Sequence, residues 1–518
     1  MLRQILSRFF TREVTPPESS IYQELTAPLF YLSNNDSFRH VDAVVGCLIL
    51  GAPGSGKSSG SGKMLRESYL SCDWMGHYGY GFLVLTAKVT ETQSWLDATK
   101  KAGREDDLII VNEENEWRCN LIAYLLDKGE SIEQVVKRIV KAVKSSSGSL
   151  DQSSNGAAEY FDKAFEQLLT NSITLLKAAG EDVTFANIYL LARNAPITAD
   201  KIRFIQSFKS FEDAKNSSLE KLAKISFFDS CAILSQEFIS NSTQELASYE
   251  VKEALHFFFN DYALMPANQR QAVYATMTAN IDPLARGIYN KLFSSETNFT
   301  PEQSRQGKII VLDIPVNKYD YVGKFAQNFF KNIWLSDLMK EAPIANTRIC
   351  SLWMDEYQNF IEESDMITFS QSREYLIAPV VLTQNLPALF ARTNDRESLA
   401  KGINGSLVNK IFHANNDVDT NLWAADLIGQ EWKEQYSFSR TDNKAERDFF
   451  NDMVFDNPTQ TLGSSTSKTR AYKVEPNRFN TLARGGLDYD LRVQAIITST
   501  RIFEATNTDY MLVEFKQQ

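Results

Sequence analysis

The chain has 518 residues, enough for two to four domains, and its 43% hydrophobic and 12% aromatic content can bury full-sized cores. Its net charge of −11 argues against a basic protein that coats nucleic acid, although an acidic exterior leaves room for a basic channel. Five cysteines without C-x-x-C spacing indicate a reducing, cytosolic compartment, and four histidines without i, i+4 spacing argue against a zinc site.

Residues 1–39 are interpreted as an N-terminal lead-in segment. The opening stretch MLRQILSRFF places apolar residues on one helical face, with arginines around it. Peripheral membrane contact through residues 1–12 and an ordinary docking helix are both open interpretations. No apolar stretch of the chain approaches the ~20 residues needed to cross a bilayer, so no transmembrane span is expected.

An apolar run from Val44 to Leu50 leads into a glycine-rich turn, in the stretch VVGCLILGAPGSGKS. The turn fits G-x-x-x-x-G-K-[ST], the pattern of a P-loop. Such a loop wraps backbone N–H groups around phosphate oxygens, while its lysine neutralises charge and its hydroxyl holds Mg²⁺. The pattern predicts ATP binding by nine residues, with Lys57 also catalytic and Ser58 also a metal ligand: Gly51, Ala52, Pro53, Gly54, Ser55, Gly56, Lys57, Ser58 and Ser59.

The register of the loop ends at Ser58, because the next glycine–lysine pair, at Lys63, is followed by methionine and not by serine or threonine. An ordinary glycine turn is the alternative interpretation. A helix is expected over 57–70, and buried strands are expected at 82–86 and 108–111. This alternation favours an α/β fold with a parallel sheet, of which residues 40–119 form the first part.

Residues 120–306 show helical periodicity with few Gly or Pro residues, which predicts an inserted all-α domain. Ser131 and Gln134 fit a capping box at the start of a helix whose apolar stripe runs from Ile132 to Val143. A flexible loop is expected at 145–156, followed by a helix over 157–176 and at least three more. The other side of the first helix is basic and suits either a phosphate backbone or solvent: Lys137, Arg138, Lys141 and Lys144.

Sheet character returns in residues 307–518, the second part of the predicted α/β domain. A strand over 308–314 and a helix over 322–339 precede the stretch ICSLWMDE at 349–356. An apolar strand that ends in two carboxylates is the Walker B arrangement. We expect Asp355 to orient Mg²⁺ and Glu356 to polarise the attacking water, whereas a strand that ends in a solvated turn is the alternative.

Two more candidate residues flank the strand expected at 378–383. Gln384 follows it and is placed to sense the γ-phosphate or position water, unless it is only a polar cap. Arg373 precedes it, on a helix or its end, and either serves a neighbouring subunit's site or forms a surface salt bridge.

The last expected strands lie at 409–414, 492–498 and 510–515. The polar stretch at 430–468 fits a mobile or pore-facing loop, which offers Lys433, Arg440 and Lys444, or a plain surface insertion.

Several stretches, in order, resemble the type IV coupling proteins of conjugation (the TraG/TraD type), within the FtsK/HerA superfamily. More than half of the chain separates Lys57 from Asp355, which is similar to the helical insertion of that family. The similar stretches are FLVLTAKVTE (82–91), RCNLI (118–122), AEYFDKAFEQLL (158–169), MDEYQNF (354–360), SREYLIAPVVLTQNLPAL (372–389) and IFHANNDVDTNLWAADLIG (411–429). The first departs from the family's D-P-K-G-E pattern at Thr86 and Ala87.

The resemblance implies a RecA-like P-loop NTPase that moves DNA, single- or double-stranded, as a homo-hexameric ring with ATP at the subunit boundaries. It implies that Arg373 acts in the neighbouring subunit, that Gln384 is the sensor, and that a relaxase or secretion channel is a partner. The implied location is the bacterial cytoplasm or the inner membrane's surface. Three alternatives stay open: a HerA-like translocase with a nuclease partner, a VirB-type ATPase that acts on protein subunits, and a non-catalytic assembly module.

Overall fold

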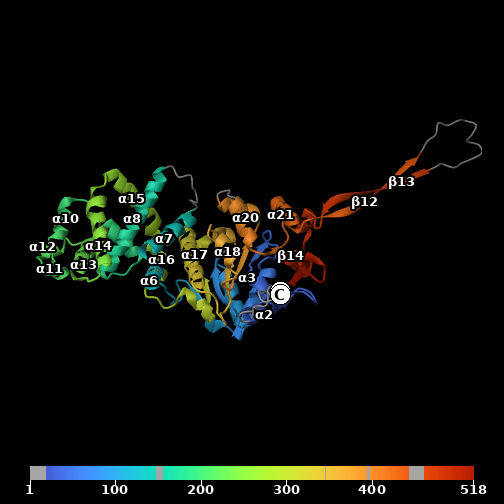
Figure 1. Ribbon diagram of the computed structural model, residues 1–518, viewed down its shortest axis with the longest axis horizontal. Helices are drawn as coiled ribbons and strands as arrows, with labels where there is room; N and C mark the ends of the chain where they lie inside the picture. The colour runs from blue at the N-terminus through green and yellow to red at the C-terminus, as the bar shows by residue number, and fades with distance from the viewer. Residues whose placement is uncertain (1–18, 148–155, 345, 394–396, 443–459, 518) are drawn as a thin grey trace, which may run out of the picture. The chain divides into compact units, whose positions relative to one another are not determined.

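The computed structural model describes residues 19–147, 156–344, 346–393, 397–442 and 460–517 (Figure 1). The chain forms two compact units. The first consists of residues 1–48, 62–383 and 388–409, and the second of residues 49–61, 384–387 and 410–518. The opening stretch at 1–12 lies outside the described residues. Among the helices that are described, none is both long and apolar enough to cross a membrane.

Nine strands belong to one sheet, in the order β15-β14-β11-β3-β10-β9-β6-β8-β7. Neighbours from β10 to β7 pair in parallel, whereas β11, β14 and β15 pair antiparallel. The prediction of a mainly parallel α/β sheet is therefore confirmed. Its strands are β3 (Cys47–Leu50), β6 (Gly81–Leu85), β7 (Leu108–Val111), β8 (Ile309–Leu312), β9 (Cys350–Met354), β10 (Ile377–Thr383), β11 (Asn409–Phe412), β14 (Arg492–Phe503) and β15 (Thr508–Lys516).

The parallel strands of the first unit are apolar on both faces. Every residue of β6, β8, β9 and β10 is buried, as expected for strands that helices cover on both sides. In register, Val84 of β6 lies opposite Trp353 of β9 and Val311 of β8. Helix α5 (Glu91–Lys101) packs on this sheet through Trp95, whose ring lies 5.5 Å from that of Trp353.

The chain from Leu121 to Gln306 contains helices and no strand among its described residues, as predicted. The capping box is confirmed, because Ser131 and Gln134 exchange backbone-to-side-chain hydrogen bonds at the start of α7. Helix α8 contacts α7, α9, α13, α14 and α15, and α7 contacts α17 (Figure 1). That residues 120–306 fold as a separate domain stays a prediction.

The helices of this stretch and its borders have the following bounds: α6 (Leu121–Asp127), α7 (Ile132–Ser147), α8 (Gly156–Ala179), α9 (Phe185–Arg193), α10 (Ala199–Gln206), α11 (Phe211–Lys215), α12 (Leu219–Leu222), α13 (Phe227–Asn241), α14 (Glu245–His256), a π-helix (Phe257–Tyr262), α15 (Ala267–Ala285), α16 (Gly287–Phe293) and a 3₁₀-helix (Pro301–Gln306). Part of the loop expected at 145–156 is wrong, because α7 continues to Ser147; residues 148–155 lie outside the described residues.

Two expected helices differ in their starts. Helix α17 runs over Val316–Leu338, not from 322, but Asp320 has non-helical angles (φ 39°, ψ −114°) that break it near the predicted start. Helix α4 runs over Ser61–Ser71, so the expected start at Lys57 is wrong. Residues 57–60 form turns instead, because Gly56 has a left-handed φ of 83° and Gly60 is a poor helix former.

Short elements connect the sheet: α2 (Ser19–Glu24), β1 (Pro28–Tyr31), β2 (Ser37–Arg39), α3 (His40–Val44), β4 (Asp73–Trp74), β5 (His77–Tyr78), α18 (Asp365–Gln371), α19 (Leu386–Arg392) and α20 (Glu397–Ser406). Val44, which was expected to open the strand before the glycine-rich turn, ends α3 instead. Gly46 separates the helix from β3 with a left-handed φ of 81°.

The second unit contains a long hairpin where a loop or plain insertion was expected. Strand β12 (Gln430–Asp442) pairs antiparallel with β13 (Gln460–Tyr472), and Figure 1 shows the ribbon projecting past α21 (Val418–Ile428). The loop prediction is wrong for these residues, because Trp432 and Tyr436 alternate with polar residues in the manner of a strand. Residues 443–459, Lys444 among them, lie outside the described residues, and the pore-facing role stays a prediction.

Candidate active site

The glycine-rich loop of the second unit connects β3 to α4 through tight turns. Ala52 donates its backbone N–H to the carbonyl of Ala414 (3.0 Å), and Ser55 donates to the carbonyl of Ala52 (3.0 Å). Gly60 closes the loop by donating to the carbonyl of Gly56. The first bond fixes the loop beside the end of β11, so its position in this unit depends on the sheet.

Two of the loop's glycines have no room for a side chain. Gly56 has a φ of 83°, and a Cβ there would come within 2.6 Å of the Val493 side chain. A Cβ on Gly51 would lie 2.3 Å from Ser55 Oγ and 2.8 Å from His413 Cβ. Gly56 therefore requires glycine for both conformation and space, and Gly51 requires it for space, so an ordinary surface turn does not explain them.

The same loop offers unpaired hydrogen-bond donors. Within the described residues, the backbone N–H groups of Gly54, Gly56 and Lys57 donate to no other group. The buried Ser55 hydroxyl also has no partner there, and Lys57 is only 7% exposed. Unpaired N–H groups beside a lysine suit a phosphate, so these residues fit the predicted nucleotide. Ser58 is exposed, as a metal ligand facing a bound nucleotide would be.

His413 packs beside the glycine-rich loop, next to Gly51, and was not predicted as a site residue. Its Nε2 is hydrogen bonded to the Ser61 hydroxyl (2.6 Å), at the first residue of α4. Burial, and after it the charge of Lys57, lower the pKa of His413 to about 3, so the ring is neutral at physiological pH. Its position directly after β11, in the stretch IFHA, is the only sequence signal that could have indicated it.

In the first unit, the two predicted carboxylates follow β9. Glu356 is 4% exposed, and its backbone N–H donates to Asp355 Oδ1 (2.8 Å). Glu356 has left-handed angles (φ 51°, ψ 52°), a conformation that costs a non-glycine residue about 1–3 kcal/mol. Its carbonyl accepts hydrogen bonds from the Asn359 backbone (2.9 Å) and side chain (3.1 Å), which hold this turn.

Both carboxylate oxygens of Glu356 have partners that were not predicted as site residues. Lys88, which follows β6, forms an ion pair with Oε1, and Gln358 donates from Nε2 to Oε2 (2.7 Å). Burial alone would lower the pKa of Lys88, but the hydrogen bond and charge of Glu356 raise it. Lys88 is the lysine of the stretch Thr86-Ala87-Lys88, which aligns with the D-P-K of the family pattern. This alignment is the sequence signal that could have identified Lys88 as a site residue.

Glu91, at the first turn of α5, adds a half-buried carboxyl near Asp355. Burial raises the pKa of Glu91 to about 8, and the charge of Asp355 contributes to the rise. Its Oε2 accepts a hydrogen bond from the backbone N–H of Ala87 (2.9 Å), directly before Lys88. Glu91 is therefore largely protonated at neutral pH and shapes the loop that carries Lys88.

Arg373 lies away from these carboxylates. It is exposed in the turn between α18 and β10, at the amino end of β10, whereas Asp355 and Glu356 follow the carboxyl end of the parallel strand β9. Among the described residues it forms no ion pair, so the surface salt bridge, which was the alternative interpretation, is absent from that part of the chain. Gln384 is the residue after β10 and belongs to the second unit. It is half-buried, and its backbone carbonyl accepts a hydrogen bond from the Asn415 side chain (2.9 Å).

The predicted site residues therefore lie in both compact units. The glycine-rich loop and Gln384 belong to the second unit, and Asp355, Glu356 and Arg373 belong to the first. That Ser58 and Asp355 share one Mg²⁺ stays a prediction.

The predicted basic face of α7 is partly neutralised by ion pairs. Arg138 binds Glu130 through two hydrogen bonds (2.8 and 2.9 Å), and Lys144 lies 2.7 Å from Asp162. Lys137 and Lys141 remain exposed. The face is thus a weaker match to a phosphate backbone than the sequence alone indicated.

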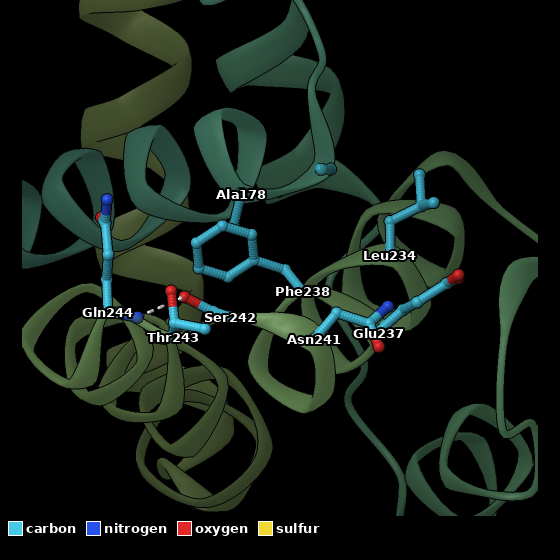
Figure 2. Close-up of a pocket in the computed structure, with 9 residues that line it drawn as sticks. Ala178, Leu234, Glu237, Phe238, Asn241, Ser242, Thr243 and Gln244 are labelled. Carbon is cyan, nitrogen blue, oxygen red and sulfur yellow. Dashed lines mark hydrogen bonds between the residues drawn. The ribbon is translucent and has the colours of Figure 1, made fainter.

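The helical stretch has a pocket of about 500 Å³ where α8 and α13 end and α14 begins. Figure 2 shows the Phe238 ring beside Ala178, and the Gln244 backbone N–H donating to the Ser242 hydroxyl (3.1 Å). Its single carboxylate, Glu237, accepts the Phe211 backbone N–H (3.1 Å). No lysine or arginine lines this pocket, so it is not a phosphate site.

Comparison with known proteins gives consistent matches. The sequence profile of the family described as type IV secretory system conjugative DNA transfer matches residues 100–450. That span includes Asp355, Glu356, Arg373 and Gln384, and it begins after the glycine-rich loop. No curated protein matches this chain in sequence.

Among solved structures, the unbound bacterial conjugative coupling protein TrwBdeltaN70 matches 96% of this chain and 89% of its own, with a TM-score of 0.55 and 12% identity. The plasmid coupling protein TrwB in complex with ADP and Mg²⁺, and in complex with a non-hydrolysable ATP analogue, matches at a TM-score of 0.54 and 12% identity. Each covers 96% of this chain and 91% of that chain. This likeness shows a shared fold. VirB4 of Thermoanaerobacter pseudethanolicus matches 74% of this chain at a TM-score of only 0.40.

Proposed function

Because this chain belongs to the type IV secretory system conjugative DNA transfer family, we propose that it is an ATP-driven translocase that moves DNA during conjugative transfer. The observation that carries the proposal is the glycine-rich loop, whose unpaired N–H groups and buried Lys57 suit a nucleotide's phosphates. The solved coupling proteins of the same fold are described with ADP and Mg²⁺ and with an ATP analogue, and we propose the same ligands here.

The proposed roles follow from the chemistry of each side chain. Lys57 neutralises the β/γ-phosphates, and Ser58 and Asp355 would hold Mg²⁺, which supplies charge neutralisation at the reacting phosphate. Glu356 accepts the proton of the attacking water, and Gln384 orients that water. The left-handed turn at Glu356 supports this role, because backbone strain of this kind is common at active sites.

Arg373 is proposed to act on the nucleotide of a neighbouring subunit. Its exposure at the amino end of β10, the edge opposite to the carboxylates of its own unit, supports a role outside its own site. An arginine supplied in this way is worth roughly 10³ to 10⁵ in turnover. The proposal therefore includes a ring of subunits, which we take to be a homo-hexamer with DNA in its channel.

The proposed setting is the bacterial cytoplasm, either free or at the inner surface of the membrane, because ATP and the DNA to be transferred are both there. The proposed partners are DNA and the other proteins of the transfer system, a relaxase or the secretion channel. A HerA-like translocase that serves a nuclease and a VirB-type ATPase that acts on proteins are the competing outcomes.

The test is the ATPase rate of the purified protein without DNA, with single-stranded DNA and with double-stranded DNA, alongside its mass by mass photometry. We expect hydrolysis that DNA stimulates, in particles of six subunits. Hydrolysis that neither form of DNA changes would contradict translocation and favour the protein-directed alternative. Hydrolysis that depends on a co-purifying nuclease would favour the HerA-like alternative, and no hydrolysis at all would leave a nucleotide-binding assembly module.

A further inference from the structure

Three neighbouring strands of the first unit end at the same edge of the sheet, and side chains from all three are connected there. Strand β9 lies between β6 and β10 and pairs with both in parallel. Lys88 follows β6, Glu356 and Gln358 follow β9, and Thr383 is the last residue of β10. Parallel strands bring these distant parts of the sequence to one edge.

The connections form a continuous row. Lys88 pairs with Oε1 of Glu356, and Gln358 donates from Nε2 to Oε2 (2.7 Å). The other end of the Gln358 amide accepts a hydrogen bond from the Thr383 hydroxyl (3.0 Å). Because the Glu356 carboxylate can only accept, the amide nitrogen of Gln358 must face Glu356, which leaves the amide oxygen to accept from the Thr383 hydroxyl.

The backbone beneath this row is anchored in the core. Tyr357, between Glu356 and Gln358, is fully buried and donates to Asp365 Oδ2 (2.8 Å). Asp365 also accepts from Lys331 of α17 (3.0 Å), and Lys331 donates to the carbonyl of Phe360 (2.7 Å). The turn that carries Glu356 and Gln358 is therefore held by buried charged groups, which allows the row to set side-chain positions accurately.

We propose that Lys88 and Gln358 are positioning residues for ATP hydrolysis, which hold Glu356 by both carboxylate oxygens and connect it through Thr383 to the strand end that carries Gln384. Neither residue touches the nucleotide in this proposal; both act through Glu356. It rests on the proposed function, because it assigns these residues to the same hydrolytic site. Thr383 directly precedes Gln384 in the chain, so the row ends one residue before the residue that is proposed to orient water.

The first experiment compares Lys88→Met, Lys88→Arg and the control Lys101→Met. Lys101 is an exposed lysine of the same unit that pairs with Glu67 on the surface (3.0 Å). We expect Lys88→Met to lower kcat by about 100-fold, the cost of a misplacement of about 1 Å at a reacting group, with the ATP Kd unchanged. Arginine should restore much of the turnover because it keeps the ion pair, and Lys101→Met should behave as wild type.

The second experiment asks whether Lys88 and Gln358 act through Glu356. In a Glu356→Gln protein, measured by single-turnover hydrolysis, Lys88→Met should cause no further loss, because the group that it holds is already gone. Gln358→Leu should behave in the same way, and Thr383→Val, which removes only the hydroxyl at similar volume, should lower kcat less than Gln358→Leu.

The outcomes separate this proposal from the proposed function. If the wild-type protein hydrolyses no ATP, the proposed function fails. If it does, and Lys88→Met keeps the wild-type kcat or loses ATP affinity and kcat together, the positioning role is overturned. Full additivity of Lys88→Met with Glu356→Gln would overturn it as well.

Discussion

The glycine-rich loop presents backbone groups, whereas the sheet edge that carries Glu356 presents side chains. The loop presents backbone N–H groups, and its residues lie within one short stretch from Gly51 to Ser61. The edge presents side chains, and its four connected residues come from three strands. The loop can present its N–H groups because its glycines lack a Cβ. The edge can hold Glu356 because the fold brings side chains from distant parts of the chain next to it.

The largest expected effect tests the loop. Lys57→Ala should abolish ATP hydrolysis, because the buried ammonium is the loop's only cation among its nine predicted ligands. The matched control is Lys63→Ala, which removes the lysine of the second glycine–lysine pair and its weak contact with Glu67 (3.9 Å). Steady-state ATPase measurement should show no turnover for the first and near wild-type turnover for the second; equal rates would reject the register of the loop.

The next effect tests whether a neighbouring subunit supplies Arg373 to the nucleotide site. Arg373→Ala should lower turnover by roughly 10³ to 10⁵. Because the arginine would act on a neighbour's nucleotide, mixing inactive Arg373→Ala with inactive Lys57→Ala subunits should restore part of the activity, since some boundaries then hold both residues. Arg392→Ala, another exposed arginine of the same unit, serves as the control. Mixtures that stay inactive after verified subunit exchange would place Arg373 in its own subunit's site or outside catalysis.

A smaller effect separates conformation from space within the loop. Gly54 and Gly56 both have left-handed φ values (71° and 83°), but only Gly56 has a neighbour within contact of an added Cβ. Gly54→Ala should therefore cost about 1 kcal/mol of stability from backbone conformation alone. Gly56→Ala adds the 2.6 Å contact with Val493, so it should cost more and should weaken ATP binding more, as urea unfolding and ATP titration can measure. If Gly54→Ala and Gly56→Ala had equal effects on stability and ATP binding, the Val493 side chain would be able to move away from the added Cβ at no cost in free energy.

The last prediction concerns acid stability and leaves the ATP site's turnover aside. His413 has a folded pKa of about 3, below its unfolded value near 6.5, so between these values the unfolded state binds a proton that the folded state does not. Stability from this group is present above pH 6.5 and is lost as the pH falls toward 3. Replacement by glutamine should reduce the slope of unfolding free energy by up to about 1.4 kcal/mol per pH unit in this window.

His40 shows why some acid sensitivity should remain in that variant. Burial lowers its pKa to about 4, and its Nδ1 is hydrogen bonded to the Tyr80 hydroxyl (2.5 Å). His413→Gln and His40→Gln should therefore each remove part of the slope. A His413→Gln protein with the full wild-type slope in urea titrations at pH 7 and pH 5 would show that His413 is not buried as a neutral ring.

Local patterns were enough to predict most of the sheet and one half of the site. Strand β7 was predicted to the residue, and β6, β8, β9, β10 and β11 to within two residues at each end, because each is a short apolar run between polar turns. The loop was predicted because its glycines are adjacent in sequence. Where local signals conflict, as at Val44 between α3 and β3 or at Lys57 before α4, the boundary was wrong.

Only the tertiary structure decided how distant residues combine. The β12–β13 hairpin was missed because the pairing of Gln430 with Tyr472 is a long-range contact that polar composition disguises. Lys88, Gln358 and His413 were missed because a lysine, a glutamine and a histidine have many surface roles and acquire one here only through partners far away in the chain. Sequence by itself determined the fold class, the family resemblance and the phosphate loop, because these depend on short patterns. The parallel sheet decided which side chains hold Glu356, because strand order is a property of the whole chain.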